Sequence, residues 1–305
     1  MRVAIVDLGT NTFNLLIAEI TKTGFTTILK EKRAVKLGKS GLKTGMIQPD
    51  AFQRGVQAMI DYKRIIDQHN VSSIKAIATS AMRDSSNSDE FQNEIDELTG
   101  IQIEIISGDR EAALIQKGVA QTLPIDLSNY MIMDVGGGST EFIIVKNKEV
   151  IWSKSYDLGV SRLLDWLQPS DPINSSEIDR LKKRLKSELN ELVEKVALYN
   201  IDSLIGSSGS FDSIHDILKW EESKDFSSND TDFNEINLQE FLKLNDKLVR
   251  STLLERLELN GLVKMRADMM VISSLEILQV LTSCKISHLF RSSFALKEGL
   301  ITTIR

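Results

Sequence analysis

Asp7-Leu-Gly-Thr-Asn-Thr12 near the start of the chain and Asp134-Val-Gly-Gly-Gly-Ser-Thr140 in its middle are two versions of one short pattern. Each follows a short apolar run and precedes another, which predicts a strand, a turn rich in glycine and hydroxyl groups, and a second strand. Such a turn can present backbone N–H groups and hydroxyls to a phosphate while its aspartate faces a cation. Two such turns can hold one phosphorylated ligand from both sides.

Together with the adjacent Glu141, the second turn contains more glycines and carboxylates than the first. Its glycines lack Cβ atoms, so the backbone can bend sharply and approach a phosphate closely. Asp134 and Glu141 accept hydrogen bonds and donate none when ionised, which suits Mg²⁺ and its water shell. A tight hairpin that merely needs glycine is the alternative. The phosphate-binding residues predicted in the two turns are Asp7, Gly9, Thr10, Asn11, Thr12, Gly136, Gly137, Gly138, Ser139 and Thr140.

Composition narrows the class of protein. A chain of 305 residues, 42% hydrophobic and 26% charged, is typical of a globular protein of about two domains. The net charge of −6 argues against a nucleic-acid partner. No apolar run is long enough for a membrane span, and Asp7 interrupts the apolar stretch where a signal peptide would lie. A lone cysteine, Cys284, fits a reducing compartment, so we expect a cytoplasmic protein.

Charge is uneven along the chain. Between Thr21 and Lys43, seven basic side chains stand against the single acidic Glu31, a local charge of +6. This stretch predicts either an exposed hairpin with solvated lysines or a basic surface that guides an anionic substrate towards the first turn.

Periodicity predicts a mixed α/β fold. The first third shows three successive strands and then alternating helices and strands, and the second half begins again with three strands. The restart predicts an internal duplication with its boundary near residues 121–129. Further predictions are one long helix over 175–199 capped by Asn174 and Glu177, a loop over 221–237, and a final strand and helix near 286–290 and 295–304.

Several runs together resemble the exopolyphosphatase and guanosine pentaphosphate phosphohydrolase family, within the actin and sugar-kinase superfamily. They span nearly the whole chain in the family's order. The runs are IVDLGTNTFNLLI (5–17), LGKSGLKTG (37–45), ATSAMR (78–83), ISGDREAALIQKGV (106–119), MDVGGGSTEF (133–142), LGVSRL (158–163), GSSGS (206–210) and LKEGL (296–300).

The resemblance implies two ribonuclease-H-like (actin-like ATPase) α/β domains with an interdomain cleft. We expect domain I over residues 1–124 and domain II over 125–291, with a C-terminal helix, about 292–305, that packs back on domain I. A homodimer stays an open prediction.

The resemblance also assigns roles to residues. Glu111, in the first turn of a helix that Ser107 would cap, takes the place of the family's catalytic base. Asp134 and Glu141 become the Mg²⁺ ligands. Arg83 becomes a phosphate clamp, with an exposed surface cation as the alternative. Gly206, Ser208 and Gly209 resemble a third phosphate loop, although a plain helix cap is equally consistent with them. Lys297 departs from the family pattern, which has arginine there.

These inferences favour a Mg²⁺-dependent phosphoanhydride hydrolase that releases terminal phosphate from inorganic polyphosphate, converts guanosine pentaphosphate to tetraphosphate, or does both. Two alternatives share the paired turns. One is an actin-like or sugar-kinase-type ATP-dependent phosphotransferase, and the other is a non-catalytic sensor of polyphosphate or alarmone nucleotides.

Overall fold

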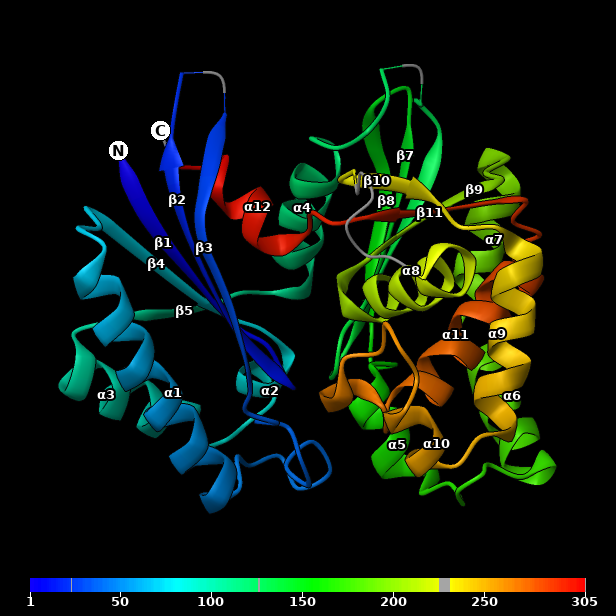
Figure 1. Ribbon diagram of the computed structural model, residues 1–305, viewed down its shortest axis with the longest axis horizontal. Helices are drawn as coiled ribbons and strands as arrows, with labels where there is room; N and C mark the ends of the chain where they lie inside the picture. The colour runs from blue at the N-terminus through cyan, green and yellow to red at the C-terminus, as the bar shows by residue number, and fades with distance from the viewer. Residues whose placement is uncertain (23, 126, 225–230, 305) are drawn as a thin grey trace.

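The computed structural model describes residues 1–22, 24–125, 127–224 and 231–304. Two β-sheets lie side by side, and helices α4 (Gly108–Val119) and α12 (Leu296–Ile301) lie between them (Figure 1). The fold is therefore mixed α/β with two sheets, as the sequence predicts.

The first sheet has the strand order β3-β2-β1-β4-β5. Strands β1, β2 and β3 are antiparallel neighbours, whereas β4 and β5 run parallel to β1. We call this sheet, with α1, α2 and α3, the first lobe. Its strands are β1 Arg2–Leu8, β2 Thr12–Ile20, β3 Phe25–Ala34, β4 Ser73–Ala78 and β5 Ile103–Ile105; its helices are α1 Pro49–Gln68, α2 Ser80–Arg83 and α3 Ser88–Thr99.

The second sheet repeats this order as β8-β7-β6-β9-β11, with β10 added at the edge. Its strand directions are also the same. We call this sheet, with helices α5 to α11, the second lobe. Its strands are β6 Tyr130–Val135, β7 Thr140–Lys146, β8 Glu149–Tyr156, β9 Ser203–Ser207, β10 Phe233–Glu235 and β11 His288–Ser292; its helices are α5 Val160–Leu167, α6 Ser175–Glu188, α7 Asn190–Tyr199, α8 Ser208–Ser223, α9 Leu238–Arg250, α10 Leu253–Leu257 and α11 Met270–Ser283, with a 3₁₀ turn at Lys264–Arg266.

Alternation along the strands divides the core into three parts, because successive side chains of a strand point to opposite faces. On β1, Ala4 and Val6 face α1 and α3, while Val3 and Ile5 face α4 and α12. From the second lobe, Ile132 packs into the same central cluster. The buried core thus continues from one lobe to the other through α4 and α12. This continuous packing fixes the position of one sheet relative to the other.

Helix α12 lies against α4 and β1, so the end of the chain returns to the first lobe (Figure 1). Helix α4, which belongs to the predicted domain I, also contacts β7 and β8 of the second lobe. The predicted boundary near residues 121–129 falls between α4 and β6, and residue 126 lies outside the described residues. None of the described helices has the length and apolarity to cross a membrane.

Three details differ from the sequence prediction. The long helix over 175–199 is two helices, α6 and α7, because the chain turns at Leu189 while that side chain stays buried. The predicted loop over 221–237 contains the end of α8 and strand β10, and its residues 225–230 lie outside the described part of the chain. Strand β9 was not predicted. The capping box of Asn174 and Glu177 is confirmed.

Candidate active site

The second Asp/Gly turn, Gly136–Ser139, is held by the start of α5. The backbone N–H of Val160 donates to the carbonyl of Gly136 at 3.0 Å, and that of Ser161 donates to Gly137 at 2.9 Å. The Arg162 Nε donates to the carbonyl of Gly138 at 2.9 Å. With three of its carbonyl oxygens held by α5, the turn lines the cleft between the lobes. Such a turn can receive a phosphate.

The first Asp/Gly turn, Gly9–Thr12, faces the second directly. A Cβ atom at Gly137 would lie 2.6 Å from the Asn11 Nδ2 and 2.8 Å from the Thr10 Cβ. The Ser161 Oγ also donates to the Asn11 Oδ1 at 2.7 Å across the cleft. Glycine is therefore required at Gly137 because the opposing turn approaches so closely. The two turns are brought together as the sequence predicts.

The two turns differ in one position that decides where a cation fits. In the first, Asp7 stands opposite Asn14, whose Nδ2 donates to the Asp7 Oδ2 at 3.0 Å. In the second, Asp134 stands opposite Glu141. Both positions lie seven residues after the aspartate. The Asn14 amide is uncharged and gives the Asp7 carboxylate a hydrogen bond. Two facing carboxylates instead place two negative charges close together when both are ionised. The second turn is thus the one suited to a divalent cation.

Hydroxyl groups orient that carboxylate pair. The Ser207 Oγ donates to the Asp134 Oδ2 at 2.6 Å, and the Ser155 Oγ donates to the Glu141 Oε1 at 2.7 Å. Burial raises the pKa of Asp134, and burial together with the Asp134 charge raises the pKa of Glu141 to about 7. Burial therefore disfavours the ionised form of both carboxyls.

Glu111 lies in the first turn of α4, as predicted, and lines the site. The Ser107 side chain caps α4 by accepting from the Arg110 N–H at 3.3 Å. The Glu111 side chain is buried, and its Oε2 lies 3.3 Å from the Arg83 Nη1. Burial raises the pKa of Glu111 well above its usual range, with Glu141 adding to the effect and Arg83 opposing it. Arg83 is thus the cation that favours the ionised form of Glu111.

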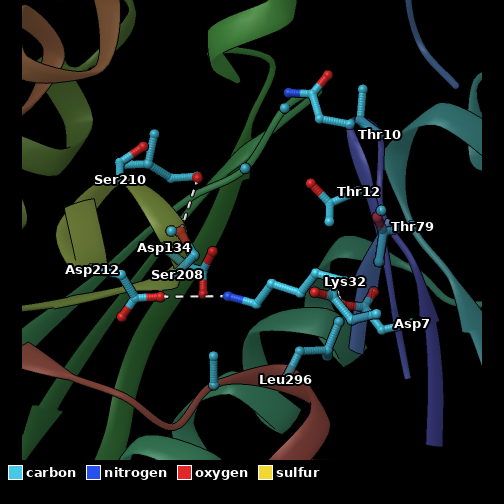
Figure 2. A pocket seen from close by; sticks show the side chains of 18 of the residues that line it. Asp7, Thr10, Thr12, Lys32, Thr79, Asp134, Ser208, Ser210, Asp212 and Leu296 are labelled. Atoms are coloured by element: carbon cyan, nitrogen blue, oxygen red, sulfur yellow. Dashed lines mark hydrogen bonds and ion pairs between the residues drawn. The ribbon is translucent and has the colours of Figure 1, made fainter. Parts of the chain in front are cut away.

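A cavity of about 220 Å³ lies between the lobes. Glu111 lines it together with both turns and Gly209 at the start of α8. Figure 2 shows Asp7, Asp134 and Ser208 around the same cavity. Four predicted site residues do not line it: Arg83, Thr140, Glu141 and Gly206.

Each of these four has another environment, which for Glu141 is the Ser155 hydroxyl described above. Arg83 lines a separate hollow together with Ser107 and donates to the Ile106 carbonyl at 2.8 Å as well as contacting Glu111. The Thr140 Oγ1 donates to the buried Glu276 of α11 at 2.8 Å. Gly206 lies in β9, where the Phe211 ring packs against it. Gly206 therefore has a packing role in this structure, while Ser207 is the N-cap of α8.

Sequence reasoning missed several charged residues of the cavity. Lys32 of β3 reaches across from the first lobe to Asp212 of α8, with Nζ and Oδ2 3.8 Å apart (Figure 2). Arg266 and Lys297 also line the cavity. Burial would lower the pKa of Lys297, but carboxylates including Glu298 and Asp7 outweigh burial and raise it. The signal for Lys32 was the predicted basic surface near the first turn, which did not single out this residue.

The basic stretch between Thr21 and Lys43 combines features of its two predicted forms, a solvated hairpin and a basic surface near the first turn. Lys30 and Lys32 line the cavity, and Lys30 contacts the buried Glu298 at 3.4 Å. Lys39 and Lys43 are exposed. Part of the stretch belongs to the cleft, and part is a solvated surface.

Comparisons with known proteins agree with this geometry. The sequence profile described as the Ppx/GppA phosphatase family matches residues 16–304. The structure is similar to that of an exopolyphosphatase from Cytophaga hutchinsonii, with 34% identity and a TM-score of 0.94 over 100% of this chain and 97% of that one.

Two curated proteins are also similar. A bifunctional 3-dehydroquinate synthase/phosphatase of Fusobacterium nucleatum is 35% identical over 218 residues, 68% of this chain and 32% of that protein. A guanosine-5′-triphosphate,3′-diphosphate pyrophosphatase of Pseudoalteromonas translucida is 26% identical over 298 residues, 98% of this chain and 58% of that protein. The chain thus spans about a third and somewhat over half of these two relatives. With the profile match over most of its length, the chain belongs to the Ppx/GppA phosphatase family.

Proposed function

We propose that this protein hydrolyses phosphoanhydrides, releasing the terminal phosphate of inorganic polyphosphate, guanosine pentaphosphate or both. The observation that carries the proposal is the buried Glu111, which lies 3.3 Å from Arg83 and lines a cavity together with the two phosphate-type turns. A cytoplasmic location stays a prediction.

The residues present can divide the work of hydrolysis. The turns and Lys32, Arg266 and Lys297 bind and orient a chain of phosphates, because phosphoryl transfer depends mainly on positioning and charge neutralisation. Glu111 accepts a proton from the attacking water, and Arg83 orients its carboxylate. The water oxygen bonds to the terminal phosphorus as the bridging P–O bond breaks. The shortened chain leaves with the former bridging oxygen on its new terminal phosphate.

The donor set fits Mg²⁺. Among the described residues, no three His, Cys, Asp or Glu side chains are gathered to hold a metal ion. Mg²⁺ needs no such cage, since it keeps several waters and takes one or two carboxylates together with substrate phosphates. Asp134 and Glu141 would supply those carboxylates. When bound, the cation would neutralise charge on the phosphate oxygens.

Cation binding should offset a loss of folding stability that the buried carboxyls of the site cause as the pH rises. Burial raises the pKa of Asp7 to about 6 and that of Glu141 to about 7. A carboxyl whose pKa is raised on folding stabilises the protein below its unfolded pKa, and this contribution is lost as pH rises through the folded pKa. Without divalent cations, we expect the melting temperature to decrease as the pH rises from about 4 to about 7. Added Mg²⁺ should raise it more at pH 8 than at pH 5, as measured by differential scanning fluorimetry. An equal Mg²⁺ effect at both pH values would argue against this cation site.

The substrate test is phosphate release without any added nucleotide cofactor. The described residues that line the cavity include no aromatic side chain, so a stacking platform for a base is lacking there. We therefore expect release from long-chain polyphosphate to exceed release from guanosine pentaphosphate, and both to stop when a chelator removes Mg²⁺.

The two alternative functions predict different results in that assay. Release that requires ATP would support a phosphotransferase. Tight polyphosphate binding without turnover would support a sensor, although a buried carboxylate paired with Arg83 at the site favours a catalyst.

A further inference from the structure

We propose that Arg162 is a positioning residue that ties the second Asp/Gly turn to helix α2 and thereby sets the distance between the phosphate-binding turn and Glu111. The proposal rests on the proposed function of the site. Arg162 belongs to the run LGVSRL, to which the sequence analysis assigns no role.

The contacts of Arg162 reach both lobes. Its Nε donates to the Gly138 carbonyl within the second lobe. Its Nη2 forms a close ion pair with Asp84, at the end of α2 in the first lobe, and lies 3.4 Å from the Ser80 Oγ. Asp84 in turn accepts from the Ser80 Oγ at 3.1 Å. One guanidinium thus bridges the cleft between a catalytic turn and a helix of the opposite lobe.

Helix α2 carries the next link. Arg83, the last residue of α2, directly precedes Asp84 and contacts the Glu111 carboxylate at 3.3 Å. A shift of α2 would therefore move Arg83 relative to Glu111. Through Asp84, Arg162 couples the position of the turn to that of the base.

The geometry of Arg162 suits this role better than a surface ion pair would. The side chain of Arg162 is 19% exposed and that of Asp84 is 35% exposed. A planar guanidinium can serve a carbonyl and a carboxylate at once, which an ammonium cannot do in the same fixed geometry. Arg162 does not line the cavity itself, so it acts through the groups that it holds.

The test compares Arg162→Met and Arg162→Lys with a matched control, Asp268→Asn. The control removes another side-chain ion pair between the lobes, Lys36–Asp268 at 2.8 Å. Lys36 also bonds to the first Asp/Gly turn, but through its backbone N–H, which donates to the Asn11 carbonyl at 2.8 Å and is unchanged by this substitution. Backbone bonds from Val160 and Ser161 still hold the turn in Arg162→Met. Substrate binding should therefore persist while the geometry of attack suffers.

We expect Arg162→Met to lower kcat about tenfold to hundredfold with little change in KM, since misplacement by about 1 Å costs rates of this order. The kcat of Arg162→Lys should lie between those of Arg162→Met and the wild type, and the kcat of Asp268→Asn should equal that of the wild type. Wild-type kcat in Arg162→Met would overturn the proposal, and so would an equal loss in Asp268→Asn.

Amide hydrogen exchange gives a reading that needs no activity. Exchange at Gly137–Ser139 and Ser80–Arg83 should be faster in Arg162→Met than in the wild type and unchanged in Asp268→Asn. Unaltered exchange in Arg162→Met would overturn the positioning role. If the wild type releases no phosphate, the proposed function fails, and the exchange result still decides whether Arg162 holds the two segments.

Discussion

Glu111→Gln should retain the fold and lose most phosphate release, by about 10²–10⁴-fold. The amide keeps the shape of the side chain and its contact with Arg83, but it cannot accept a proton from water. The folded state should be no less stable, because the variant removes a carboxyl whose pKa burial has raised well above its usual range. Initial rates with polyphosphate and thermal unfolding measure the two effects.

The pH profile gives this prediction a second check. Activity of the wild type should rise with pH as Glu111 ionises, and the residual activity of Glu111→Gln should lack that rise. The matched control is Asp109→Asn, which neutralises an exposed carboxylate in the same helical turn. Near-wild-type turnover in Glu111→Gln would remove Glu111 from the role of base.

Glu141→Gln should abolish most of the response to Mg²⁺. The change makes the second turn resemble the first, where Asn14 stands opposite Asp7 and satisfies it without adding charge. Loss of one of the two carboxylates should reduce the stabilisation of the transition state by the cation by about 3 kcal/mol. This corresponds to a rate roughly 10²-fold lower. Mg²⁺ binding by calorimetry, alongside phosphate release, measures this effect directly.

Glu149→Gln is the control for this second variant, because Glu149 is an exposed glutamate of the same sheet. It should bind Mg²⁺ and release phosphate as the wild type does. If Glu141→Gln bound Mg²⁺ with wild-type affinity, the cation would have to lie elsewhere in the cleft.

The sequence predicted the parts of the site that local patterns define. Each Asp/Gly turn sits between two strands that pair with one another, so each strand–turn–strand unit follows from a short stretch of sequence. Glu111 was also predictable, since Ser107 marks the start of its helix and the run around it resembles a family motif. These features depend on neighbours within a few residues in sequence.

What the sequence did not predict depends on distant contacts. Lys32 and Asp212 meet only because two lobes enclose one cavity, and no periodicity links them. The contact of Arg83 with Glu111 likewise joins two residues that are 28 positions apart in the sequence. The break between α6 and α7 was hidden because Leu185, Leu189 and Leu192 keep helical spacing through it and all remain buried.

The most direct test of the whole account is hydrolysis of long-chain polyphosphate in water enriched in heavy oxygen, with Mg²⁺ and without nucleotide. Attack by water on the terminal phosphorus predicts that each released orthophosphate carries one heavy oxygen from the solvent. Label-free orthophosphate, or no release until a nucleotide is added, would contradict the assignment of Glu111 as a base that activates water in a phosphoanhydride hydrolase.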